Sequence, residues 1–353
     1  MTWTLETLRK RREEAFAWLN ATQFFGALND NIFKALIQMF IIGMVPDTKA
    51  RTLAVATIVF ALPYLFFTSY AGFLADRFSK KRVTVLLKYA ELAIMLGALL
   101  AFALGANWLL YLLLFMMSAQ SALFSPTKYS ILPELVRRDN LSRANGLLVM
   151  CSFLAIITGS FVAPLVAKFV SWLFISPETG AGENLAYAIA QLACVLIAVA
   201  GILTSHRVLP LRSVNPGLHP DLFFPRKMWR TFSWVRQDKH LLLAMFGACL
   251  FSMIAAFLQI NLVRYGMDHV KLDVKASTFL FFFAAIGIAA GAWIAGRLSK
   301  RNIEFGTMPG GAFLMALSTY ILGLIPAGPH AVVVSGFVFL AGLGAGLFTV
   351  PLD

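Results

Sequence analysis

Ionisable residues lie inside the first long apolar segment, which runs from about residue 15 to residue 44. Asp30 and Lys34 are one helical turn apart, and Gln23 lies seven residues before Asp30, so on a helix these side chains share one face. A charged side chain at the centre of a membrane-spanning helix costs about 2.5 to 3.5 kcal/mol and persists mainly where it faces other helices or a water-filled cavity. We therefore expect this face, together with the neighbouring Asn31, to bind a polar substrate.

Two other interpretations of the same stretch remain open. Asn29-Asp30-Asn31 is also typical of a turn between two short apolar helices. Asp30 and Lys34 could instead form an ion pair whose role is only structural. The distribution of charge among the loops, described below, argues against the turn, because a turn would place the N-terminal tail on the side opposite the later basic loops.

The composition indicates a membrane protein. Of the 353 residues, 59% are hydrophobic and 13% are charged, whereas soluble domains carry about 25% charged residues. The net charge of +13 could suggest a nucleic-acid partner, but the positive residues lie in loops between apolar runs, so no nucleic acid is expected. Cys151, Cys194 and Cys249 lie in apolar runs without a Cys-x-x-Cys spacing, and we expect no disulfide, metal or cofactor.

Ten apolar runs are long enough to cross a membrane. They lie at about 15–44, 53–75, 83–105, 108–127, 146–174, 185–204, 240–263, 276–296, 307–325 and 331–352. Threading them alternately through a bilayer places 21 Lys and Arg residues in one set of loops and 5 in the other. The positive-inside rule therefore predicts an all-α polytopic membrane protein with a cytoplasmic N-terminus.

Two short segments recur at a nearly constant spacing. Arg77-Phe78-Ser79-Lys80-Lys81 is echoed 220 residues later by Arg297-Leu298-Ser299-Lys300-Arg301. Ser121-Ala122-Leu123-Phe124-Ser125 is echoed 224 residues later by Ala345-Gly346-Leu347-Phe348-Thr349. A duplicated six-helix unit would give this pattern, and parallel repeats related by an axis along the membrane normal occur in secondary transporters.

The longest hydrophilic connection, at 205–239, separates six of the runs from four. We therefore predict an N-terminal half at 1–204, a central cytoplasmic loop at 205–239 and a C-terminal half at 240–353. The second part of the loop, Met228-Trp229-Arg230-Thr231-Phe232-Ser233-Trp234-Val235-Arg236, mixes aromatic residues with arginine. It could lie on the membrane surface or be a plain linker.

A glycine, an aspartate and a run of basic residues lie around the loop after the second apolar run. Gly72-Phe73-Leu74-Ala75-Asp76-Arg77-Phe78-Ser79-Lys80-Lys81-Arg82 resembles the motif between the second and third helices of the major facilitator superfamily. The resemblance implies the major facilitator fold of two pseudo-symmetric six-helix halves. It also implies a latch between the cytoplasmic ends of the halves, formed by Gly72, Asp76, Arg77, Lys81 and Arg82. The second copy has Gly296 where an Asp would be, so the latch is expected to be one-sided.

Two further stretches narrow the family resemblance. Phe25-Gly26-Ala27-Leu28-Asn29-Asp30-Asn31-Ile32-Phe33-Lys34 and Phe124-Ser125-Pro126-Thr127-Lys128-Tyr129-Ser130-Ile131-Leu132-Pro133-Glu134-Leu135 resemble the bacterial lysophospholipid transporter branch. They are most similar to the form fused to an acyltransferase and an acyl carrier protein synthetase. The resemblance implies movement of lysophospholipids, chiefly the ethanolamine type, to the cytoplasmic leaflet of the bacterial inner membrane for reacylation. Membrane lipids and such an enzyme are the implied partners.

The polar residues fit such a substrate chemically. A lysophospholipid head group carries an anionic phosphate and often a cationic amine, and Lys128 could meet the phosphate while Asp30 meets the amine. Tyr129, next to Lys128, is included in the predicted site. Lys128 could instead extend from its helix end toward the cytoplasm. Lys88 and Glu91, one turn apart in the third run, are expected to form a structural pair.

Two enzyme-like activities find no support in the sequence. None of the five histidines has an Asp five residues later, as acyltransferase chemistry would need, and no Gly is followed by Lys, as a phosphate-binding loop for ATP would need. The remaining alternative is a proton-coupled major facilitator exporter of drugs or other small solutes. Because that family has twelve helices and only ten runs precede Asp353, the chain also looks like a fragment that lacks the last two.

Overall fold

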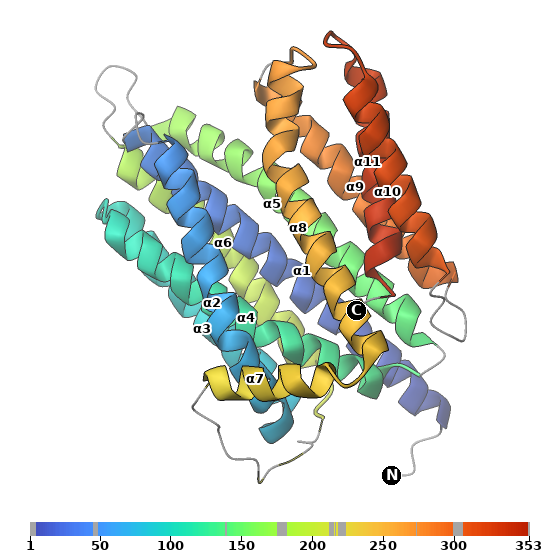
Figure 1. Ribbon diagram of the computed structural model, residues 1–353. Helices are drawn as coiled ribbons and strands as arrows, with labels where there is room; N and C mark the ends of the chain where they lie inside the picture. The colour runs from blue at the N-terminus through green and yellow to red at the C-terminus, as the bar shows by residue number, and fades with distance from the viewer. Residues whose placement is uncertain are drawn as a thin grey trace. The chain divides into compact units, whose positions relative to one another are not determined.

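The chain is helical throughout the part that the structure describes (Figure 1). The structure is a computed structural model, and it describes residues 5–44, 49–137, 140–174, 182–211, 215, 217, 224–272, 274–298 and 306–351. Its helices are α1 (Leu5–Met44), α2 (Lys49–Arg77), α3 (Lys80–Ala103), α4 (Asn107–Leu135), α5 (Leu141–Phe174), α6 (Glu183–Arg207), α7 (Phe224–Val235), α8 (Lys239–Asp268), α9 (Val274–Leu298), α10 (Thr307–Leu324) and α11 (Ala331–Thr349). The predicted all-α class is confirmed, and each predicted run falls largely on one helix.

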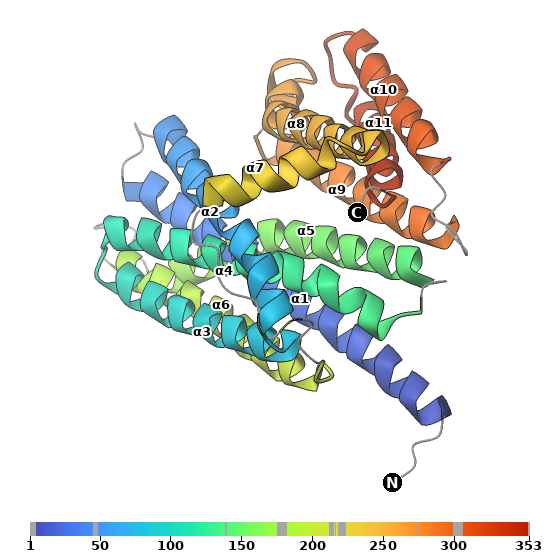
Figure 2. The same cartoon turned by 60° about the horizontal axis from the view of Figure 1, so that its bottom comes forward.

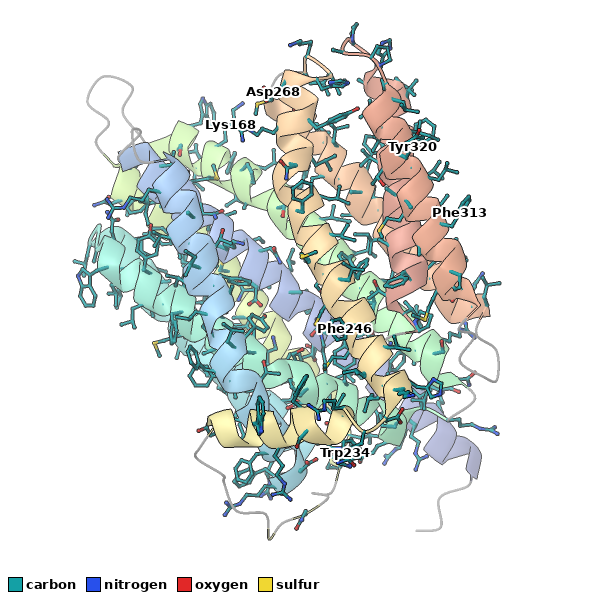
Figure 3. The ribbon with its side chains drawn as sticks, in the orientation of Figure 1. Lys168, Trp234, Phe246, Asp268, Phe313 and Tyr320 are labelled. Carbon is teal, nitrogen blue, oxygen red and sulfur yellow. The ribbon has the colours of Figure 1, made fainter. Side chains whose placement is uncertain are left out.

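Most of these helices suit a lipid bilayer. Seven helices in the described part are long and apolar enough to cross a membrane, and eight if the bent α2 is counted as one span. The sequence predicted ten, and α1 and α8 are the two that are not among them. Large apolar side chains stand exposed along α8 and α10, among them Phe246, Phe313 and Tyr320 (Figure 3). Such exposure is unfavourable in water but ordinary against lipid tails. The chain is therefore a multi-pass membrane protein.

The first helix is longer than the sequence predicted. α1 has 40 residues and begins at Leu5 rather than near residue 15. Its first turns are rich in Glu, Lys and Arg, which are good helix formers. At a rise of about 1.5 Å per residue it measures about 60 Å, twice the thickness of the hydrocarbon core of a bilayer. α1 therefore continues into water, and Asn29-Asp30-Asn31 is not a turn.

The chain forms two compact units by contact, which we describe separately. Unit 1 comprises Met1–Val136 and Thr158–Phe224. In this unit α1 packs against α4 and α6, and α3 packs against the same two helices, as Figure 2 shows from a second side. The rings of Phe40, Phe102 and Tyr187 pack together at one end, with centroids 5.1 to 6.0 Å apart.

Unit 2 comprises Arg137–Ile157 and Pro225–Asp353. Its main contact joins α9 to α11, where glycines allow the backbones to approach closely. A Cβ added to Gly342 would lie 3.1 Å from the Ile288 backbone nitrogen, and one added to Gly291 would lie 3.1 Å from Cα of Gly346. The units follow contacts rather than sequence repeats, so the predicted halves at 1–204 and 240–353 and the loop at 205–239 remain predictions.

The second copy of the basic motif has a steric reason for its glycine. Within unit 2, Gly296 of α9 faces the first turns of α5, and an added Cβ would lie 3.3 Å from Cα of Arg143 and 3.4 Å from Cα of Gly146. An aspartate at this position would push the two helices apart. Close packing therefore accounts for the absence of the acidic residue that the first copy carries.

Candidate functional site

Polar side chains gather in the interior of unit 1 between α1, α3 and α4. We call this group the polar core and define it by Asn29, Asp30, Lys88, Glu91, Gln120 and Ser121. All except Ser121 are buried. Buried polar groups in an apolar helix bundle destabilise it unless they are paired, so their presence needs a structural or a functional reason.

Asp30 is held by α4 through a single hydrogen bond. The Ser121 hydroxyl donates to Oδ2 of Asp30 at 2.6 Å and lies 3.1 Å from the Gln120 side-chain oxygen. The Gln120 amide donates to the Leu87 carbonyl of α3 at 3.2 Å. The other carboxylate oxygen of Asp30 accepts no hydrogen bond from the described residues, although the side chain is only 8% exposed. Asp30 thus keeps one acceptor available inside the bundle.

Glu91 uses both of its oxygens to join α1 and α3. Asn29 donates to one oxygen at 2.7 Å, and the Lys88 ammonium lies 2.6 Å from the other. Both charged side chains are 1% exposed. The predicted Lys88–Glu91 pair is confirmed, and Asn29 is a member that the sequence analysis did not assign. Gly26 leaves the room that Lys88 occupies, because a side chain there would collide with its ammonium.

The polar face of α1 does not form the ion pair that was considered. The Lys34 ammonium lies over the Phe60 ring, 4.8 Å from the ring centroid, and no Asp30–Lys34 pair occurs among the described residues. The structural-pair interpretation is therefore wrong: α4 supplies the partner of Asp30, and α2 supplies the partner of Lys34. Asn31 is half-buried and donates to the Ala27 carbonyl of its own helix at 2.7 Å.

The other predicted binding residues lie in the same unit. Gln23 is 7% exposed. Lys128 of α4 is 8% exposed, with its ammonium 5.0 Å from the centroid of the half-buried Tyr129 ring. This burial argues against an extension of Lys128 into water. Both predicted head-group ligands, Asp30 and Lys128, are therefore buried side chains of unit 1.

The predicted latch residues lie in the last turns of α2 and the first turn of α3, and they differ in their surroundings. Asp76 is exposed, and its backbone carbonyl accepts from the Asn215 amide at 2.9 Å. The Arg77 guanidinium lies 5.6 and 5.4 Å from the centroids of two phenylalanine rings, Phe73 and Phe78. Gly72 has open space around its Cα. Lys81 donates to the His206 carbonyl at 2.7 Å, and Arg82 is exposed.

The basic motif also ties the ends of the helices of unit 1 together. Lys80 pairs with Glu134 and donates to the Ser130 carbonyl at 2.8 Å, which joins α3 to α4. The Ser79 hydroxyl donates to the Leu211 carbonyl at 2.9 Å. Part of this motif therefore stabilises one unit, while a latch between halves stays a prediction.

The sequence matches the family model described as Major Facilitator Superfamily over residues 9–352. The chain belongs to the major facilitator superfamily. It is therefore a transporter and not an enzyme. The family that the motifs predicted is confirmed, and similar curated proteins come from the predicted branch. The lysophospholipid transporter LplT of Photorhabdus laumondii is 28% identical over 341 residues, which span 94% of this chain and 77% of that protein. LplT of Citrobacter koseri is 29% identical over 343 residues, which span 94% of this chain and 77% of that protein.

Solved structures of major facilitator transporters share the fold. The E. coli fucose:proton symporter superimposes with a TM-score of 0.74 at 15% identity, over 96% of this chain and 82% of that chain. A bacterial homologue of the iron transporter ferroportin, in an outward-facing state, gives a TM-score of 0.65 at 14% identity, over 96% and 83%. At these identities the likeness shows the fold alone.

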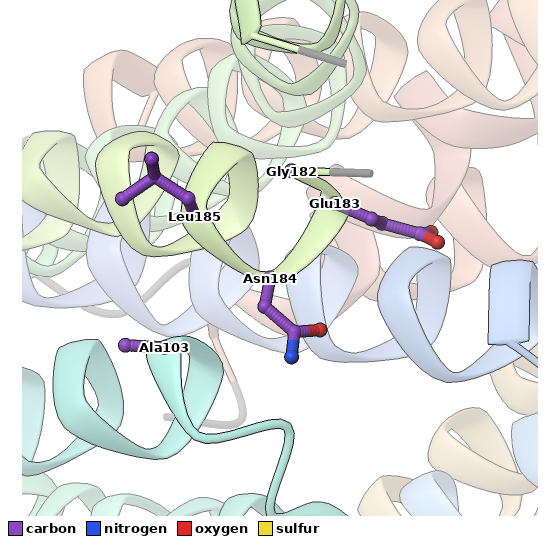
Figure 4. Close-up of a pocket in the computed structure, with 5 residues that line it drawn as sticks. All are labelled: Ala103, Gly182, Glu183, Asn184 and Leu185. Carbon is purple, nitrogen blue, oxygen red and sulfur yellow. The ribbon is translucent and has the colours of Figure 1, made fainter. Parts of the chain in front are cut away.

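A pocket in this major facilitator chain lies away from the polar core. It has a volume of about 420 Å³ and is lined by Ala103, Gly182, Glu183, Asn184 and Leu185 (Figure 4). Ala103 is twelve residues beyond Glu91 on α3, a separation of about 18 Å along the helix. None of the predicted site residues lines this pocket, so the polar core remains the candidate substrate site.

Proposed function

We propose that this transporter moves lysophospholipids, with lysophosphatidylethanolamine as the main substrate. The observation that carries the proposal is the buried Asp30 carboxylate, which keeps one oxygen without a hydrogen bond from the described residues, in the same unit as the buried Lys128. An ethanolamine head group has a cation for Asp30 and an anion for Lys128. The similar LplT proteins are lysophospholipid transporters, which supports the same substrate class.

In the proposed cycle the head group crosses the membrane by alternating access. Gln23, Asn31, Lys34 and Tyr129 would line its path beside Asp30 and Lys128. The substrate would reach the cytoplasmic leaflet of the bacterial inner membrane, where an acyltransferase and acyl carrier protein synthetase would reacylate it. Gly72, Asp76, Arg77, Lys81 and Arg82 would latch one state of the cycle.

Uptake of a labelled lysophospholipid tests the proposed role of Lys128. The protein is produced in bacterial cells that lack their own lysophospholipid transporter, and uptake of labelled lysophosphatidylethanolamine is measured. We expect Lys128→Met to lower uptake by about 10- to 100-fold, because a charge-assisted hydrogen bond to phosphate contributes about 1.5 to 3 kcal/mol. Lys168→Met, which changes an exposed lysine of unit 1, is the matched control and should transport normally. No uptake by the unchanged protein, with efflux of drugs or other small solutes instead, would favour a proton-coupled exporter.

The proposed orientation gives a second prediction. Ala327, between α10 and α11, and Gln237, between α7 and α8, are both exposed and are expected on opposite sides of the membrane. A membrane-impermeant thiol reagent added to intact cells should modify Ala327→Cys and leave Gln237→Cys unmodified, because the basic loops stay in the cytoplasm. Labelling of Gln237→Cys alone would reverse the proposed orientation. Opening the cells should expose both positions and serves as the control.

A further inference from the structure

The short helix α7 carries aromatic side chains that are exposed in the described part of the chain. Trp229 and Trp234 are 73% and 68% exposed, and Phe232 is 40% exposed. Trp229 and Phe232 lie three residues apart on one face, with ring centroids 6.2 Å apart. The helix is strongly amphipathic. A soluble loop would leave these rings in water, which the hydrophobic effect disfavours.

The turn between α7 and α8 is fixed by hydrogen bonds. The amides of Gln237 and Asp238 donate to the carbonyls of Trp234 and Val235 at 3.1 Å and thus close the last turn of α7. The Asp238 carboxylate then caps α8 by accepting from the amides of His240 and Leu241 at 2.9 and 3.3 Å. Within unit 2, α7 therefore has a set direction where α8 begins, and it extends sideways from the start of that helix (Figure 1).

Basic residues surround the exposed rings. Arg230, Arg236 and Lys239 are all exposed, and Asp238 is occupied in capping α8. Tryptophan and arginine together are typical of helices that lie at the boundary between lipid tails and head groups. A helix that extends sideways from the end of a helix that enters the membrane lies at the depth of that boundary.

We propose that α7 binds the surface of the membrane that α8 enters, with its aromatic face among the acyl chains and its arginines on anionic lipid head groups. The charge of the helix decides the occupant, because anionic phosphates complement arginine and an apolar protein groove does not. The proposal rests on the membrane location of the chain and not on its substrate. Failure of lysophospholipid transport would therefore leave it standing.

A fluorescent label reports the position of each face of α7. An environment-sensitive label is placed on Phe232→Cys or on Thr231→Cys, an exposed position about 100° around the helix from Phe232 and about 160° from Trp229, in a protein whose three native cysteines are alanine. The protein is reconstituted into vesicles of phosphatidylglycerol and phosphatidylcholine. We expect the label at residue 232 to be quenched by shallow lipid-borne quenchers and shielded from iodide, whereas the label at residue 231 should be open to iodide. Equal access of iodide to both labels would overturn the proposal.

Charge reversal tests the anionic partner. Each cation near an anionic surface strengthens binding about fivefold, so Arg230→Glu with Arg236→Glu should raise iodide access at residue 232 several-fold in the mixed vesicles. Arg264→Glu, an exposed change at the other end of α8, is the matched control and should leave access unchanged. The same iodide access in vesicles of phosphatidylcholine alone would reject anionic lipid as the partner. Label shielding that persists in detergent without lipid would assign the face to protein contact instead.

Discussion

Asp30→Asn is expected to lower lysophospholipid transport by about 10- to 100-fold while the protein keeps its stability. Asparagine can still accept the hydrogen bond that the Ser121 hydroxyl donates at 2.6 Å, but it cannot pair with a cation. The loss corresponds to a charge-assisted hydrogen bond of about 1.5 to 3 kcal/mol. Neutralising a buried carboxylate also removes a desolvation cost, so thermal unfolding in detergent should not move to a lower temperature. Transport and unfolding are measured on the same preparations.

Ser121→Ala provides the matched control for this change. It removes the hydrogen bond to Asp30 and leaves the carboxylate charged, so a head group that binds the charge should still be transported, with a loss of about tenfold or less. The opposite ranking, with Ser121→Ala inactive and Asp30→Asn active, would show that the hydrogen bond matters and the charge does not. Full transport by Asp30→Asn would remove Asp30 from the substrate site and leave Lys128 as the better candidate.

Local spacing in the sequence predicted the helices and part of the polar core. An apolar run of sufficient length must become a helix in a bilayer, because its backbone groups have no other partners there, and each predicted run lies in a helix. The i,i+3 spacing of Lys88 and Glu91 was likewise enough to predict their ion pair, which the structure places at 2.6 Å.

Contacts between distant segments could not be read from spacing. Asp30 and Lys34 were the right distance apart to pair on α1, but Ser121, which lies 91 residues away, is the partner of Asp30. Asn29 is next to Asp30 in sequence yet points to Glu91 of α3, because adjacent residues on a helix are about 100° apart. Which partner each side chain finds depends on which helices become neighbours. The recurring segment that begins at Ser121 contains the partner of Asp30, but as a sequence pattern it indicates only a repeat.

The other large effect is expected at Glu91. Glu91→Gln should destabilise the protein by about 3 to 5 kcal/mol, because it leaves the charge of Lys88 buried without its counterion. Both side chains are 1% exposed, and Gly26 and Gly201 pack beside Lys88, so the ammonium cannot move into water without disturbing α1 or α6. Thermal and denaturant unfolding in detergent would measure the loss.

A double variant without either charge separates the effect of the unpaired Lys88 charge from the effect of changed side-chain packing. Lys88→Met with Glu91→Gln removes both charges, and the glutamine oxygen can still accept the hydrogen bond that Asn29 donates at 2.7 Å. We expect this variant to recover most of the stability, since a buried ion pair is often no more stabilising than a neutral pair of similar volume. Glu134→Gln is the control: Glu134 is 32% exposed, and its partner Lys80 also donates to the Ser130 carbonyl, so the loss should be about 1 kcal/mol or less. Equal losses in Glu91→Gln and in the double variant would mean that the packing of the Lys88 side chain, rather than its unpaired charge, holds α1 and α3 together.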